Sequence, residues 1–241
     1  MREHDVVLYG NDAAALARWV TPFIGSALQD GGAAVIIACS EHERGFRSAL
    51  AALAIDPTSS AVSERLFFLD ASDLAKSLLS GGKVVPGRFE RLIGHKIRTL
   101  CERYSVHAYG EIVGIYRALG KPDAARDLEQ LWNELLEETP FRLLCGYPVD
   151  VLGSPDPAKE MDPIFTSHTA LVSALPGFQS ALEASIESAL GAQRAAAIRG
   201  MIESSSRPGW PAMSSPESTL LWLRENYAQR ADAIIEDARD R

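Results

Sequence analysis

The chain has 241 residues, of which 46% are hydrophobic and 23% are charged, so it can bury a full apolar core. A net charge of −8 without a dense Lys/Arg block argues against contact with nucleic acid or an anionic membrane. No run approaches the ~20 apolar residues of a membrane helix, and three widely spaced cysteines form no disulfide framework, so we expect a cytoplasmic protein.

Short apolar runs in the first 150 residues predict buried β-strands. These runs cover residues 5–9, 33–39, 65–71, 106–109 and 141–148. Between them, apolar residues recur at the spacings of three and four that are typical of amphipathic helices, as in the helix that begins near Pro122. Strands that are continuous apolar runs and alternate with helices predict an α/β fold. The fold should have three layers, with helices on both faces of a mostly parallel sheet.

The composition changes after about residue 175. Residues 177–203 are rich in Ala and have a helical pattern, and residues 204–216 resemble a Ser- and Pro-rich linker. A last helix is expected from near Pro216 toward Ala238. We therefore expect an α/β domain over residues 1–175 and a C-terminal helical extension over residues 176–241, with its linker near 204–216.

Polar and aromatic side chains follow the expected strands at the edge where open α/β sheets bind ligands. In chain order they are Tyr9, Asn11, Ser40, His42, Asp70, Ser72, Tyr109, Glu111 and Tyr147. Such a mixture is typical of a small-molecule pocket. Asn11, Ser40 and Ser72 have the alternative role of capping helices.

The sequence motifs of three common chemistries are absent. Neither G-x-x-x-x-G-K-[ST] nor G-x-G-x-x-G occurs, which argues against a phosphate-binding loop. No two histidines have the i, i+4 spacing of a helical metal pair, and there is no C-x-x-C or G-x-S-x-G. We therefore expect no catalytic residue, no metal and no cofactor. Folding could still bring Cys39, Cys145 and a histidine together.

Three linked motifs lie between residues 109 and 148: YGEIV at 109–113, LEQLWN at 128–133 and FRLLCGYP at 141–148. Together they resemble the MEDS family, a sensory domain named for methanogens, methylotrophs and the dichloromethane regulator DcmR. The segments EHDVVLYGND, AAVIIACSEH and FTSHTAL extend the resemblance over residues 1–172. They carry over His4, Tyr9, His42 and His168.

The resemblance implies a RecA/KaiC-like fold without a working phosphate loop. It also implies a sensory role in signal transduction or transcription regulation, with small, often hydrocarbon-derived ligands. Two departures matter. Neither a helix-turn-helix nor a histidine kinase is evident, and this chain has Ile115-Tyr116 and Arg117 where members often have an apolar-Trp pair. The polarity of the pocket, and hence the ligand, stays open.

Two sets of site residues follow from the strand ends and the resemblance. Ligand contacts are expected from Tyr9, His42, Tyr109, Glu111, Tyr147 and His168. A structural network is expected from His4, Glu129, Trp132 and Asn133, with His4 pointing toward the amino-terminal edge of the sheet. Glu111 has the alternative role of a favourable charge at a helix start, and Tyr147 and His168 that of plugging the pocket floor.

The expected function is that of a non-catalytic sensory protein. It would bind a small organic molecule at the carboxyl edge of the sheet and signal through its C-terminal helices to a partner protein or a second copy. Two alternatives stay open: a protein-interaction scaffold, and a degenerate RecA-like nucleotide-binding protein.

Overall fold

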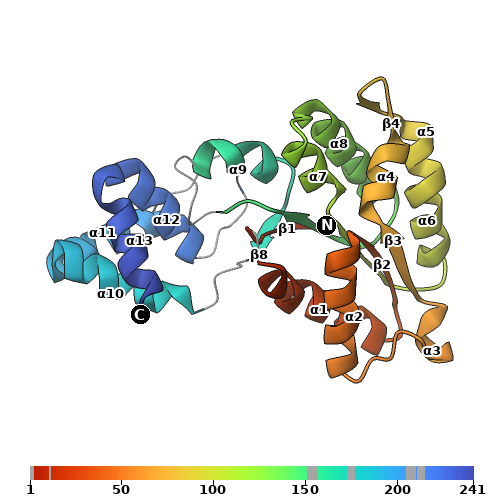
Figure 1. Ribbon diagram of the computed structural model, residues 1–241, viewed down its shortest axis with the longest axis horizontal. Coiled ribbons are helices and arrows are strands. Elements are labelled where there is room, and N and C mark those ends of the chain that lie inside the picture. Colours follow the sequence, from red (N-terminus) through yellow and green to blue (C-terminus); the bar gives the residue numbers. More distant parts are fainter. Residues whose placement is uncertain (1–2, 11, 151–156, 173–176, 205–209, 211–214) are drawn as a thin grey trace.

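A computed structural model describes residues 3–10, 12–150, 157–172, 177–204, 210 and 215–241. Six strands form one parallel sheet in the order β3-β2-β6-β7-β1-β8 (Figure 1). The strands are β1 (Glu3–Leu8), β2 (Ala33–Ala38), β3 (Leu66–Asp70), β6 (Val106–Gly110), β7 (Arg142–Tyr147) and β8 (Ala170–Val172). A small antiparallel hairpin, β4 (Leu79–Ser80) and β5 (Lys83–Val84), stands apart from this sheet. The predicted parallel α/β sheet is confirmed, with β8 as a strand that the sequence did not indicate.

Helices cover both faces of the sheet, as expected (Figure 1). One face packs against α1 (Ala13–Gln29) and α2 (Ser40–Ala52) through a core that includes Leu16, Ile36, Phe46 and Leu144. The other face packs against α4 (Ala71–Leu78), α6 (His95–Cys101), α7 (Ile112–Ala118) and α8 (Pro122–Glu138). A π-helical turn η1 (Glu90–Gly94) joins α5 (Pro86–Phe89) to α6, and α3 (Ser60–Ser63) precedes β3. Because helices bury both faces of the sheet, the strands carry apolar side chains on both sides.

The register of the parallel strands aligns their carboxyl ends along one edge. Leu8 of β1 lies opposite Tyr147 of β7, and Ile37 of β2 lies opposite Gly110 of β6. Gly146 allows one close contact there, because a β-carbon at this position would overlap the Tyr109 hydroxyl. The residues that follow these strands are consequently brought together at that edge.

The C-terminal part is helical, as predicted. It contains α10 (Phe178–Leu190), α11 (Ala192–Ser204), α12 (Ser215–Asn226) and α13 (Ala228–Arg239), which pack on one another (Figure 1). The single last helix expected from Pro216 to Ala238 is wrong, because the chain turns at Tyr227 and α13 folds back on α12. An ion pair of 2.6 Å between Arg224 and Asp232 joins these two helices, and the fold-back lets both bury apolar side chains.

The expected domain boundary near residue 175 and most of the expected linker lie outside the described residues. The division into two domains stays a prediction, as does the relationship to RecA and KaiC. Within the expected linker the structure describes Trp210 and the two ends, at residues 204 and 215–216. The indole Nε1 of Trp210 donates to Asp162 at 2.7 Å, and its ring lies 4.8 Å from that of Phe165. Both partners belong to α9 (Pro157–Phe165).

No helix among the described residues has both the length and the apolarity needed to cross a membrane. The cytoplasmic location expected from the sequence stays a prediction.

Candidate functional site

The expected site residues form two clusters. The Glu111 cluster contains Tyr9, Cys39, His42, Tyr109 and Glu111. The Glu129 cluster contains His4, Glu129, Cys145, Tyr147 and His168. The six expected ligand contacts are thus divided, with four in the first cluster and Tyr147 and His168 in the second.

The Glu111 carboxylate joins the carboxyl ends of two neighbouring strands. It is 3% exposed and accepts hydrogen bonds from the backbone N–H of Cys39 and from the hydroxyl of Tyr109 at 3.1 Å. His42 Nδ1 lies 2.7 Å from the same carboxylate. Glu111 precedes α7, but its side chain makes no capping bond to that helix. Its hydrogen bonds therefore hold the turn between β2 and α2 against β6.

Burial, hydrogen bonds and charges within the Glu111 cluster shift several of its pKa values. The hydrogen bond that the protonated His42 ring donates to Glu111 raises the pKa of His42; burial opposes this shift, and the negative charges of Glu111 and Glu41 add to it. Burial raises the pKa of the Cys39 thiol, and the negative charge of Glu111 adds to this effect. Burial likewise raises the pKa of Tyr9. Cys39 therefore stays a thiol at neutral pH rather than a reactive thiolate.

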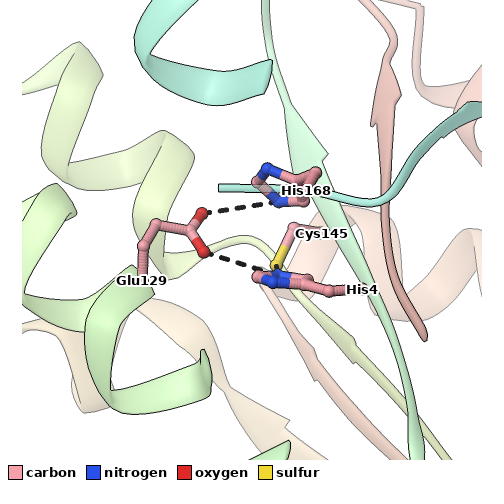
Figure 2. A group of neighbouring side chains, drawn as sticks. All are labelled: His4, Glu129, Cys145 and His168. Atoms are coloured by element: carbon pink, nitrogen blue, oxygen red, sulfur yellow. Dashed lines mark hydrogen bonds and ion pairs between the residues drawn. The ribbon is translucent and has the colours of Figure 1, made fainter. Parts of the chain in front are cut away.

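The Glu129 cluster lies on the opposite face of the sheet, beneath α8. His4 Nε2 lies 3.3 Å from Cys145 Sγ and 3.4 Å from Glu129 Oε2. His168 Nε2 lies 3.6 Å from Glu129 Oε1. Figure 2 shows these four side chains directed toward a common point. The Tyr147 hydroxyl also donates to Glu129.

Hydrogen bonds from outside the cluster fix the two histidine rings. His4 Nδ1 lies 2.8 Å from Asn133 Oδ1, and His168 Nδ1 lies 2.6 Å from the backbone oxygen of Ile164. The structure thus places Asn133 beside His4. Trp132 lies outside the cluster and packs edge-on against Phe89, with ring centres 5.1 Å apart. It is a residue of the apolar core.

Burial dominates the electrostatics of the Glu129 cluster. It raises the pKa of Glu129, although the positive charge of a protonated His4 and the Tyr147 hydrogen bond oppose the shift. It also raises the pKa values of Cys145 and Tyr147 well above their ordinary ranges, with the Glu129 charge as a second cause. Charged forms of these groups are costly here unless an opposite charge lies beside them.

A pocket of about 240 Å³ opens onto this cluster. Glu129 and Tyr147 lie on its wall, and Tyr147 is the last residue of β7, so the pocket reaches the carboxyl edge of the sheet. The rest of the lining comes from the end of α7, from α8 and from the region of α9: Arg117, Pro122, Ala125, Arg126, Pro163, Thr166 and Ser167.

The structure places two of the site residues where sequence reasoning did not. His4 is the second residue of β1, and its ring reaches Cys145 inside the sheet rather than pointing away from the site. Cys145 was expected in an apolar strand, with the alternative that folding brings it together with Cys39 and a histidine; the structure places it beside His4, whereas Cys39 lies in the other cluster. The sequence does place Cys145 two residues before Tyr147. Because alternate residues of a strand share one face, this spacing puts the two side chains on the same side of the sheet. Arg117 was noted in the sequence as a departure from the family pattern but was not named as a site residue, and the structure places it in the lining of the pocket.

Comparison with protein families matches residues 3–168 to MEDS, described as the methanogen/methylotroph, DcmR sensory domain. No curated protein matches the chain. The match covers both clusters and the whole sheet up to the start of β8. This chain therefore belongs to the MEDS family of sensory domains.

Proposed function

We propose that the protein is a non-catalytic sensor that binds a small organic molecule in the pocket beside Tyr147. The bound molecule would change how the C-terminal helices present themselves to a partner protein or a second copy. Membership of a sensory family supports the role. The observation that carries the proposal is the 240 Å³ pocket at the carboxyl edge of the sheet, where this class of fold binds ligands.

The lining of the pocket favours a small ligand with an acceptor or anionic group. Sites for drug-sized molecules span roughly 300–1,000 Å³, and this pocket is smaller. Arg117 and Arg126 supply positive charge, Thr166 and Ser167 supply hydroxyls, and the proline rings supply apolar surface. A short aliphatic carboxylate matches both the charge and the volume.

A route from the pocket to the C-terminal helices runs through α9. Pro163 of α9 lines the pocket, and Asp162 and Phe165 of the same helix hold Trp210. A ligand that shifts α9 would therefore shift the segment that leads into α12. The ligand can do this only if it binds two arrangements of α9 with unequal affinity.

The state of Cys39 supports the absence of catalysis. Cys39, His42 and Glu111 have donor atoms within 4.8 Å of one another, an arrangement that resembles a nucleophile with its base. The raised pKa of Cys39 keeps the sulfur protonated, and His42 is engaged by the carboxylate. A thiol in this state is a weak nucleophile.

The test is a thermal-shift titration of the whole chain with acetate, propionate, butyrate and valerate, beside the matched alcohols. A ligand present at 100 times its Kd adds about 2.7 kcal/mol of stability. For a domain of this size that corresponds to a rise in Tm of roughly 5–10 °C.

A variant pair locates the binding. Thr166→Trp places a large side chain at the exposed side of the pocket and should abolish the shift. Thr99→Trp makes the same change at an exposed position of α6 and should leave it intact. The proposal fails if no compound of the panel raises Tm, or if the shift is equal in both variants.

A further inference from the structure

The geometry points to a transition-metal site of the Zn²⁺ class formed by His4, Glu129, Cys145 and His168. The four donor atoms come from β1, α8, β7 and the turn before β8, and all lie within 4.8 Å of one another. All four residues are buried. This inference does not depend on the proposed ligand, and its test uses the metal alone.

The spacing of the donors fits one tetrahedral ion. Zn–N bonds of about 2.0–2.1 Å and a Zn–S bond of about 2.3 Å place neighbouring ligand atoms roughly 3.3–3.6 Å apart. His4 Nε2 lies 3.3 Å from Cys145 Sγ and 3.4 Å from Glu129 Oε2, and His168 Nε2 lies 3.6 Å from Glu129 Oε1. Figure 2 shows the four groups arranged around one point. One donor atom from each of the four residues lies within 4.8 Å of the other three.

The histidine tautomers also suit a metal. The backbone carbonyl of Ile164 can only accept a hydrogen bond, so His168 carries its proton on Nδ1. Asn133 Oδ1 is also an acceptor, so His4 likewise carries its proton on Nδ1. Each Nε2 then presents a lone pair toward a Glu129 oxygen. Two lone pairs repel unless a proton or a cation lies between them. Fixing Nδ1–H with an oxygen acceptor is the usual outer-shell arrangement of histidine ligands.

Charge balance selects the class of ion. A dication with the Glu129 carboxylate, a Cys145 thiolate and two neutral imidazoles has no net charge, which suits a buried site. Thiolate and imidazole donors suit Zn²⁺ and Co²⁺, whereas Mg²⁺ and Ca²⁺ prefer oxygen ligands alone. Four protein ligands make a closed site of the structural type. Tyr147 donates to Glu129 and completes the outer shell.

The site would join elements that are far apart in the sequence. It connects the central strands β1 and β7 to α8, and it fixes the turn in which His168 leads from α9 to the edge strand β8. The sequence led to an expectation of no metal because it contains no close pair of ligands. The donors are 16 residues or more apart along the chain and meet only in the folded sheet.

The experiment begins with the full chain, stripped of metal by dipicolinate and then titrated with Co²⁺. One equivalent should produce the thiolate-to-cobalt charge-transfer band and the visible bands of tetrahedral Co²⁺. Zn²⁺ should remove both sets of bands, and Mg²⁺ in excess should remove neither. Absence of the charge-transfer band in the unaltered chain, or its removal by Mg²⁺, overturns the inference.

Variants assign the ligands. Cys145→Ser should abolish the charge-transfer band, and His168→Gln should weaken Zn²⁺ binding by at least about 100-fold. Cys39→Ser is the matched control and should change neither. A band that survives Cys145→Ser, or that Cys39→Ser removes, contradicts the assignment.

A fourth variant keeps the test valid if loss of a ligand unfolds the chain. Asn133→Ala leaves all four ligands in place and removes only the group that orients His4. It should retain the tetrahedral spectrum while affinity falls by about 10–100-fold. Circular dichroism confirms that the chain is folded. Unchanged affinity in the folded Asn133→Ala variant counts against the site.

Discussion

Replacing Glu111 by Ala should strongly destabilise the α/β body, because three donors from two strand ends depend on this carboxylate. They are the backbone N–H of Cys39, the hydroxyl of Tyr109 and Nδ1 of His42. Tyr109 is fully buried, so its hydroxyl cannot turn to water after the substitution. His42 is partly exposed and can be solvated.

The magnitude follows from the donors that lose their acceptor. A buried donor left unsatisfied costs about 1–3 kcal/mol, so the Tyr109 hydroxyl and the Cys39 amide together give about 2–6 kcal/mol. Glu111→Gln keeps one acceptor oxygen and should cost about 1–3 kcal/mol. Glu43→Gln is the matched control, because Glu43 forms only a surface pair with Arg47. It should change stability by less than about 1 kcal/mol.

Urea unfolding of the three variants, followed by far-ultraviolet circular dichroism at pH 7, measures these differences. The loss in free energy of unfolding should be largest for Glu111→Ala, smaller for Glu111→Gln and smallest for Glu43→Gln. If Glu111→Ala costs less than about 1 kcal/mol, the carboxylate does not hold the strand ends together.

Two further predictions concern the same cluster. NMR titration of the His42 ring should give a pKa above its ordinary value of 6.5, and Glu111→Gln should lower it. Because the folded pKa is raised, the stability contributed by charged His42 is fully present below about pH 6.5 and is lost as pH rises through the folded pKa. If Glu111→Gln leaves the pKa of His42 unchanged, the coupling between His42 and Glu111 is disproved. Gly146→Ala should cost about 1–3 kcal/mol in urea unfolding, because the new methyl group overlaps the Tyr109 hydroxyl. Gly45→Ala, at a helical site with open space, should be neutral or stabilising by up to about 1 kcal/mol, and equal effects at the two glycines would refute the packing argument.

The strands of the sheet, and the polar residues that follow them, could be predicted because local signals determine them. Continuous apolar runs indicate strands buried on both faces, and the structure places five of its six parallel strands at those runs. The strands β2 and β6 are neighbours, so the residues that follow them meet at one edge. His42 and Glu111 lie together for that reason. Strand β8 has three residues and is too short to give such a signal.

The Glu129 cluster depends on strand register, which the sequence does not reveal. Tyr109 pairs with Leu144, and both face α1 and α2. Tyr147 is three residues after Leu144, so the alternation of the strand turns it to the opposite face, toward α8. His168 joins it from beyond α9 across a long sequence separation. Two tyrosines at neighbouring strand ends thus belong to different clusters.

Hydrogen–deuterium exchange with and without a carboxylate that raises Tm tests the central claim most directly. Ligand should slow exchange around α9, at residues 157–165, and should also change exchange in α12 and α13, because Trp210 connects α9 to the segment that precedes them. Asp162→Ala removes the Trp210 hydrogen bond and should keep the protection at α9 while reducing the change in α12 and α13. Protection at α9 with no change in the C-terminal helices of the unaltered chain would contradict signalling through them, and protection only elsewhere would contradict the pocket.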